Sequence, residues 1–134
     1  MAKSRFPPLL HLSYVLQQKC ESALEAEAGV GLSAARIMSV LDKSVPTSQQ
    51  VIAMELAQTE SNVSRQLQAM KKQGLVNISR NKKDNRQRDV TLTAKGASRY
   101  IEAEKLLKKQ QRQILNILTA GEAAALEYAA KKLA

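Results

Sequence analysis

The sequence predicts a mainly α-helical chain with one small β-hairpin. Apolar residues recur at helical spacing through most of its length, and Ser or Thr stands where helix N-caps are expected. Between residues 76 and 92 the apolar period changes from 3.6 to 2, which is the period of β-strands. With 134 residues, of which 44% are hydrophobic, the chain is long and apolar enough for one packed domain, residues 1–134.

The first two expected elements are helices. An apolar stripe predicts a helix over residues 8–28, which Gly29 and Gly31 end. Ser33 is the expected N-cap of a second apolar helix that closes near Lys43.

Two shorter helices follow and form a helix-turn-helix. Thr47 and Gln50 have the T-x-x-Q spacing of a capping box, which opens a helix through Leu56. Thr59 is the expected cap of the next helix, and Gly74 stops it.

A hairpin and two further helices complete the chain. Strands 76–79 and 89–92 each have one apolar face, and the polar segment 81–88 joins them. Thr93 is the expected cap of a long helix with a heptad seam, and a T-x-x-E capping box at Thr119 opens the last helix.

This order of elements predicts a winged helix-turn-helix core, residues 32–95, with terminal helices on both sides. The terminal segments 1–28 and 96–134 carry apolar stripes that the small core cannot cover alone, so we expect them to be dimerisation helices of a homodimer. The alternative is that these helices fold back on their own chain.

The positive charge of the chain is concentrated in the core. The formal net charge is +9, and residues 60–95 supply +6 of it, with nine basic and three acidic side chains. Such a concentration is typical of a surface that binds a polyanion, although a basic surface can also serve solubility alone. None of the four aromatic residues lies in this block, and single-stranded nucleic acids are usually held by aromatic stacking. Double-stranded DNA is therefore the expected partner.

The helix over residues 59–73 has the properties of a recognition helix. Val63, Leu67 and Met70 share its core-facing side, and the opposite side carries no bulky apolar residue. Arg can pair with guanine, and Asn or Gln with adenine, from the N-terminal end of such a helix. The expected base-reading residues are Ser61, Asn62, Arg65 and Gln66. An ordinary solvated helix face is the alternative interpretation.

The hairpin over residues 76–92 is expected to act as a basic wing. A basic tip beside a helix-turn-helix can cross the phosphates and insert an arginine into a narrow minor groove. We expect Asp84 to orient Arg86 by a charge-assisted bond. The wing residues expected at DNA are Arg80, Lys82, Lys83, Asp84, Arg86 and Arg88.

The stretch ESNVSRQLQAMKKQGLVNISRNKKDNRQRDVTLTAKG resembles the core of the multiple-antibiotic-resistance regulator (MarR/SlyA) family. The family's K-x-G-L-V, D-x-R and L-T-x-x-G motifs correspond here to Lys72–Val76, Asp84–Arg86 and Leu92–Gly96. The resemblance follows the whole chain in helix order, but only residues 56–96 carry specific motifs.

The resemblance implies how the residues would meet DNA. Ser61, Asn62, Arg65 and Gln66 would enter the major groove, Arg86 would enter the minor groove, and the amides at Ser48 and Gln49 would face phosphate. It also implies a dimer built from the terminal helices and a pocket for a small-molecule effector, often a lipophilic anion. No sharp motif defines the ligand-binding residues, which stay unassigned.

Two positions depart from branches of this family. Asn85 stands in the wing where an arginine is common, so the wing is expected to depend more on Arg86 and Arg88. Cys20 lies late in the first helix, whereas thiol-sensing members carry theirs early, so we expect a packing or surface residue.

Regulation of transcription, most often repression, is therefore the expected function, either ligand-responsive or constitutive. The alternative is a protein-interaction winged helix with an incidental basic face. No catalytic set, phosphate-binding glycine loop or metal cluster is present in the sequence, so we expect no enzyme, cofactor or metal, and His11 alone makes no metal site. No membrane-spanning run or secretory signal is evident, so a cytoplasmic protein is expected.

Overall fold

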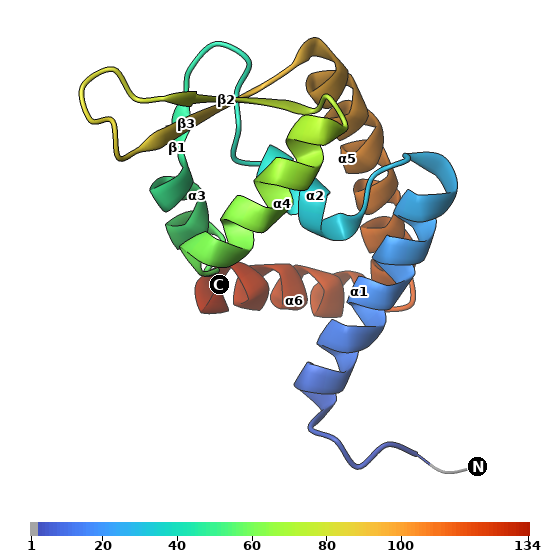
Figure 1. Cartoon of the computed structure of the whole chain (residues 1–134). Coiled ribbons are helices and arrows are strands. Elements are labelled where there is room, and N and C mark those ends of the chain that lie inside the picture. The colour runs from blue at the N-terminus through green and yellow to red at the C-terminus, as the bar shows by residue number, and fades with distance from the viewer. Residues whose placement is uncertain (1–2) are drawn as a thin grey trace.

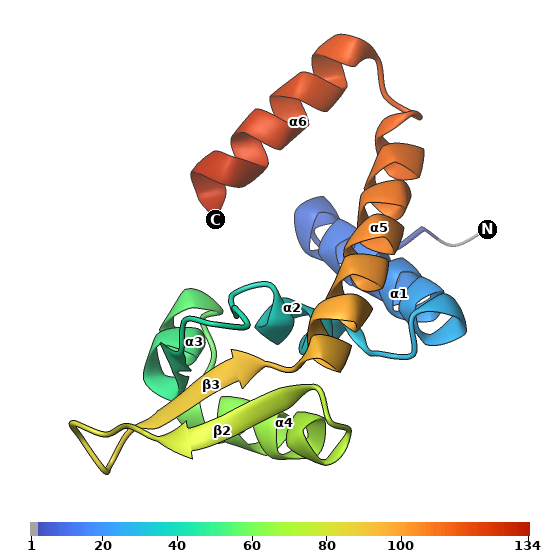
Figure 2. The same cartoon turned by 90° about the horizontal axis from the view of Figure 1, so that it is seen from above.

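The computed structural model describes residues 3–134, which form six helices and a three-stranded sheet (Figure 1). In chain order the elements are α1 Pro8–Glu27, α2 Leu32–Met38, β1 Thr47–Ser48, α3 Gln49–Glu55, α4 Glu60–Lys72, β2 Val76–Arg80, β3 Arg88–Leu92, α5 Ala94–Leu115 and α6 Ala120–Leu133. The short helices and the sheet form a head at one end. Helices α1 and α5 pack against each other beside this head, and α6 stands clear of them (Figure 2).

The hydrophobic core lies between the elements of the head and the faces of α1 and α5 that pack against them. Leu24 of α1, Ile37 of α2, Ile52 of α3 and Val90 of β3 are fully buried there. Helix α4 contributes Val63, Leu67 and Met70, so the core-facing side that the sequence predicts for this helix is confirmed.

The sheet has the antiparallel order β1-β3-β2. Strands β2 and β3 form the predicted hairpin, with Val76 opposite Leu92 and Arg80 opposite Arg88. The two-residue strand β1 pairs with the other edge of β3, where Thr47 lies opposite Val90. The sequence predicted two strands, and the third was missed because its partner is distant along the chain.

Two predicted helix starts were wrong. Helix α2 begins at Leu32, after Gly31, so Ser33 is not its N-cap. The amide of Leu32 instead donates to the Glu21 carboxylate at 3.0 Å. The helix also ends at Met38 rather than near Lys43. Helix α3 is capped by Ser48, whose hydroxyl accepts from the amide of Val51 at 3.2 Å. Thr47 lies in β1 instead, so the T-x-x-Q capping box is absent.

The other three caps are as predicted. The hydroxyl of Thr59 accepts from the amide of Asn62, and that of Thr93 accepts from the amide of Gly96. Thr119 and Glu122 form both bonds of a capping box at the start of α6.

The end of α4 is fastened to the start of α5. The Thr93 hydroxyl donates to the carbonyl of Gly74 at 2.6 Å, and the Thr93 amide donates to the carbonyl of Leu75 at 3.1 Å. The Lys95 ammonium donates to the C-cap carbonyl of α4 at 2.8 Å. Gly96 is required here, because a Cβ at this position would lie 2.0 Å from the carbonyl oxygen of Leu75. We refer to these contacts as the α4–α5 junction.

The apolar stripes on the terminal helices are exposed. Within residues 3–134, α6 contributes no buried residue, so this helix does not fold back onto its own chain. Large hydrophobic side chains with more than half of their area exposed near the two ends are Phe6, Leu9, Leu10, Tyr14, Ile117, Tyr128 and Leu133. In the described part of the chain, no helix is long and apolar enough to cross a membrane.

Candidate nucleic-acid interface

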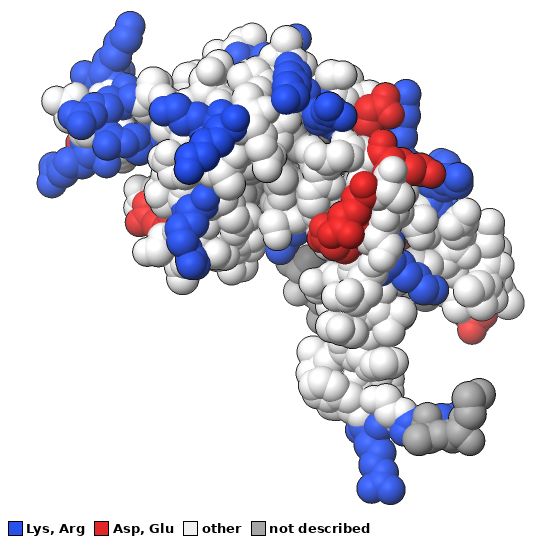
Figure 3. Space-filling model, turned by 45° about the vertical axis from the view of Figure 1, so that its right-hand side comes forward, with Lys and Arg blue, Asp and Glu red and all other residues white. Residues whose placement is uncertain are grey.

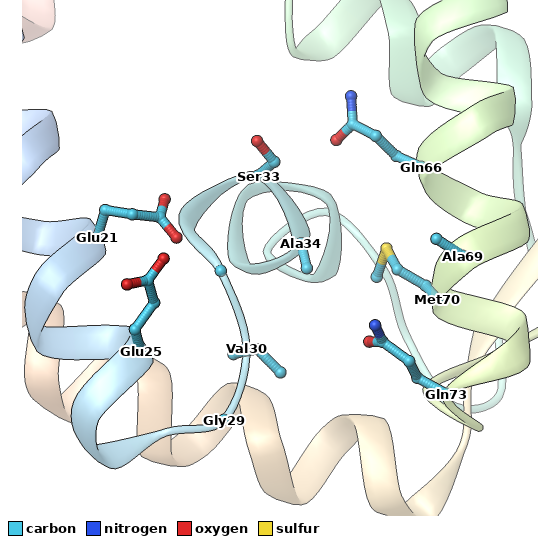
Figure 4. Close-up of a pocket in the computed structure, with 11 residues that line it drawn as sticks. Glu21, Glu25, Gly29, Val30, Ser33, Ala34, Gln66, Ala69, Met70 and Gln73 are labelled. Atoms are coloured by element: carbon cyan, nitrogen blue, oxygen red, sulfur yellow. The ribbon is translucent and has the colours of Figure 1, made fainter.

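Helix α4 presents its polar side away from the core. Ser61 and Arg65 are exposed, and Asn62 is half-buried beside them. Gln66 is also half-buried, but its side chain lines a cavity against α2 together with Ser33 and Ala34 (Figure 4). The structure therefore brings Ser61, Asn62 and Arg65 together on one surface and turns Gln66 partly away from it.

A residue in the preceding turn joins the polar side chains of α4. The side-chain oxygen of Gln58 accepts from Asn62 Nδ2 at 3.1 Å and from Gln66 Nε2 at 2.9 Å. Asn62 Oδ1 in turn accepts from the Arg65 guanidinium at 3.3 Å. Sequence reasoning missed Gln58, although it precedes Asn62 by four residues and Gln66 by eight, which is the spacing of one helix face.

The wing tip is organised by Asn81. Its side-chain amide donates to the Asp89 carboxylate at 3.1 Å, and its side-chain oxygen accepts from the amides of Lys83 at 2.8 Å and Asp84 at 3.0 Å. The Asp84 carboxylate accepts from the amide of Arg86 and pairs with its guanidinium at 3.5 Å. This is the ion pair that the sequence predicts, and it leaves 95% of the Arg86 side chain exposed.

Basic side chains gather on the wing. Arg80, Lys82 and Lys83 are exposed, as is Arg86, while Arg88 is half-buried in β3. Figure 3 shows the basic side chains crowded on the wing at the upper left and spread over the adjoining head, whereas acidic side chains gather on the α1 side. The basic block of residues 60–95 is thus also gathered in space, on the wing and the head.

Ser48 and Gln49 lie at the start of α3, beside the sheet. Ser48 is paired with Asp89 of β3, and its hydroxyl is used as the cap of α3. Gln49 is half-buried. Both positions lie on the head, next to the strand that carries the wing.

A cavity of about 470 Å³ lies between α1, α2 and α4. The carboxylates of Glu21 and Glu25 point toward its centre, and Gln66 and Gln73 line the opposite wall (Figure 4). Within residues 3–134 neither carboxylate forms an ion pair. Such a wall disfavours the lipophilic anions that the family resemblance implies, because like charges repel.

Cys20 and His11 do not contribute to these surfaces. Cys20 is half-buried in α1, and burial raises the pKa of its thiol because the thiolate loses solvation. His11 is exposed near the start of α1. Among the described residues, no group of three or more His, Cys, Asp or Glu side chains could hold a metal ion.

Comparisons with known proteins give a partial match to one family and several similar solved structures. The model of the MarR family matches residues 28–87, from the end of α1 to the wing tip. The fold is similar to that of a MepR–DNA complex from S. aureus (TM-score 0.84, 17% identity, 98% of this chain and 97% of that chain). It is also similar to the transcriptional repressor CouR bound to a 23-mer DNA duplex (TM-score 0.85, 20% identity, 94% and 89%). A mutant MarR from E. coli complexed with operator DNA is a third match (TM-score 0.79, 22% identity, 98% and 99%).

No curated protein sequence matches the chain significantly. The similarity to the family rests on the sequence match over the helix-turn-helix and wing, and the solved structures show a similar fold over nearly the whole length. Over residues 28–87 the chain is thus similar to the MarR family, and over nearly its whole length it shares the winged-helix fold of the solved structures.

Proposed function

We propose that this chain is a homodimeric transcriptional regulator, a repressor, that binds duplex DNA in a sequence-specific manner. The observation that carries the proposal is the pairing, on one head, of an exposed polar α4 face with an exposed basic wing. Solved structures with the same fold include complexes with DNA, which supports this use of the head.

In this proposal α4 enters the major groove and the wing reaches toward the minor groove. Arg65 can pair bidentately with guanine, and Asn62 can pair with adenine, with Ser61 beside them. Gln66 would join them only if its side chain left the cavity wall that it lines. Arg86 and Arg88 serve the minor groove, where arginine is attracted by the enhanced negative potential of narrow segments. Arg80, Lys82 and Lys83 neutralise phosphates, Asp84 holds Arg86, and Ser48 and Gln49 lie where α3 can approach the backbone.

The terminal helices are proposed to form the dimer. Segments 1–28 and 96–134 flank the winged core, 32–95, and expose large apolar side chains that one copy leaves uncovered. A second copy would cover them and would place two α4 helices on one side of a duplex. A two-fold dimer reads a pseudo-palindromic operator, whose half-sites lie about one helical turn apart, about 10 base pairs.

Small-molecule control is proposed to act at the cavity between α1, α2 and α4. It borders both a dimerisation helix and the back of the recognition helix, so a bound effector could release DNA. Because the chain is similar to the MarR family of regulators, we propose that it is a binding protein without catalytic activity and that it requires no cofactor. We also propose that it acts in the cytoplasm.

Fluorescence anisotropy of labelled duplexes tests the function. The expected result is selective binding of one sequence from upstream of the chain's own gene by two chains per site, with log affinity falling with log salt at a slope of about −0.9 per neutralised phosphate. Arg65→Ala should relax the base preference, whereas Lys82→Ala should weaken binding to all sequences similarly. Equal loss of discrimination in both variants contradicts this division. A monomer without preference for duplex DNA favours the protein-interaction module instead.

A further inference from the structure

Gln58 lies in the turn before α4 and binds two polar side chains of that helix. Its single side-chain oxygen accepts from Asn62 Nδ2 at 3.1 Å and from Gln66 Nε2 at 2.9 Å. We propose that Gln58 is a positioning residue that sets the base preference of the recognition helix. This inference rests on the proposed DNA-binding function.

The bond from Gln58 fixes which way the Asn62 amide points. A carboxamide has a donor end and an acceptor end, and recognition of adenine requires both ends in one orientation. With Nδ2 on Gln58, Oδ1 is free to accept from Arg65 at 3.3 Å. A flipped Asn62 would set its oxygen against that of Gln58 and would face Arg65 with an N–H group. Gln58 therefore orients Asn62, and through Asn62 it also orients Arg65.

The same oxygen holds Gln66 away from the reading surface. Gln66 lies against the cavity wall, and its Oε1 is fully buried and accepts no hydrogen bond within the described residues (Figure 4). Burial of an unpaired acceptor is unfavourable, so the bond to Gln58 is the polar contact that retains Gln66 there. Without it, Gln66 would gain hydrogen bonds by turning outward and would add a second carboxamide to the face that meets the bases.

The turn between α3 and α4 gives Gln58 a defined position. Ala57 has a φ of 53°, in the left-handed region, and the Gln58 amide donates to the carbonyl of Ala53 at 2.9 Å. The next residue, Thr59, is the N-cap of α4. Because its backbone is fixed next to the start of α4, the Gln58 side chain can hold Asn62 and Gln66, one and two helical turns further along.

Two variants of the full-length dimer test the proposal. Gln58→Met keeps the approximate shape but removes the acceptor, whereas Gln58→Glu keeps an acceptor for both amides. The assay is competition anisotropy against the operator, against every single-base change in one half-site, and against unrelated duplex. Melting curves of the free proteins accompany it.

For Gln58→Met we expect discrimination to fall about tenfold or more at one or two adjacent bases, while affinity for unrelated duplex stays within about twofold. Gln58→Glu should retain the wild-type order of base preferences, with a uniform loss from its negative charge. An unchanged profile in Gln58→Met overturns the proposal. So does an equal loss on all duplexes together with a lower melting temperature, which indicates a merely structural role. A wild-type chain without base preference removes the proposed function and this inference with it.

Discussion

Gly96→Ala tests the α4–α5 junction by adding one methyl group. The new Cβ would lie 2.0 Å from the Leu75 carbonyl oxygen and 3.0 Å from its carbon. Both atoms belong to the backbone between α4 and β2, so no flexible side chain can move aside. The start of α5 must shift outward instead, and the 3.1 Å bond from the Thr93 amide to the same oxygen must lengthen.

The expected cost is about 3 kcal/mol of unfolding free energy. Overpacking costs about 1–3 kcal/mol, and a rigid backbone obstacle places this site at the upper end. The strained hydrogen bond adds about 1 kcal/mol. The higher helix propensity of alanine compared with glycine offsets up to about 1 kcal/mol of this loss. For a chain of this size the melting temperature should fall by about 12 °C.

Thermal unfolding followed by circular dichroism measures this change at a fixed chain concentration, since the proposed dimer would make the melting temperature depend on concentration. Gly121→Ala is the matched control, because its Cβ would meet no atom within 4 Å. It lies in the first turn of α6 and should melt at the wild-type temperature or slightly above it. If Gly96→Ala melts within about 2 °C of the wild type, the steric argument for this glycine is refuted.

Three further variants test the wing, the last helix and the thiol. Asn81→Ala removes the hydrogen bonds that order the wing tip and should weaken binding to all duplexes by about fivefold in anisotropy assays. Asn85→Ala, at an exposed neighbouring position, should leave the affinity unchanged, and a loss confined to the operator would argue against a general wing contact. Thr119→Ala removes the capping box of α6 and should lower the stability of that helix by about 1 kcal/mol, seen as about fivefold faster amide hydrogen exchange. Thr119→Ser should keep the wild-type exchange rate, and equal exchange rates in the two variants would contradict the role of the cap. Because burial raises the pKa of Cys20, its thiol stays protonated at neutral pH, and its alkylation rate should rise at higher pH than that of free cysteine. A rise at lower pH, or release of DNA by peroxide that is lost in Cys20→Ser, would contradict this and indicate that Cys20 is a thiol sensor.

Local signals in the sequence were enough to predict most of the fold. The caps at Thr59, Thr93 and Thr119 act on amides three residues away, so a short window contains both partners. The apolar face of α4 and the alternation in the hairpin are likewise periodic patterns within one element. These predictions were confirmed because the interactions that decide them are local.

The wrong predictions concern contacts between distant residues. Helix α2 starts at Leu32 because Glu21, eleven residues earlier, accepts its amide hydrogen bond. Strand β1 exists because Thr47 meets Val90 across the sheet, and this pairing also moves the α3 cap from Thr47 to Ser48. A short stretch of sequence around the start of α2 or around β1 does not contain the residue whose contact determines that element.

The sequence predicted which residue types form the candidate site better than it predicted where their side chains point. Gln66 was grouped with Asn62 and Arg65 because it stands near the start of α4, yet helix rotation puts it only about 40° from buried Met70. That angle is the signal that could have placed it at the cavity. Gln58 has the i, i+4, i+8 spacing of one helix face with Asn62 and Gln66, but it lies in the turn before α4, so the periodicity within the helix did not include it.

The α4–α5 junction has a mechanical consequence. Because Thr93 and Lys95 bind the end of α4 directly, we expect a tilt of α5 to be passed to α4 and not absorbed in a loop. Helix α5 has 22 residues and is therefore a lever about 33 Å long. A tilt of about 5° at its far end displaces the junction by about 3 Å, close to the rise of about 3.4 Å for one base pair. In the proposed DNA complex, small rotations among the terminal helices would therefore be enough to move α4 out of register with the groove.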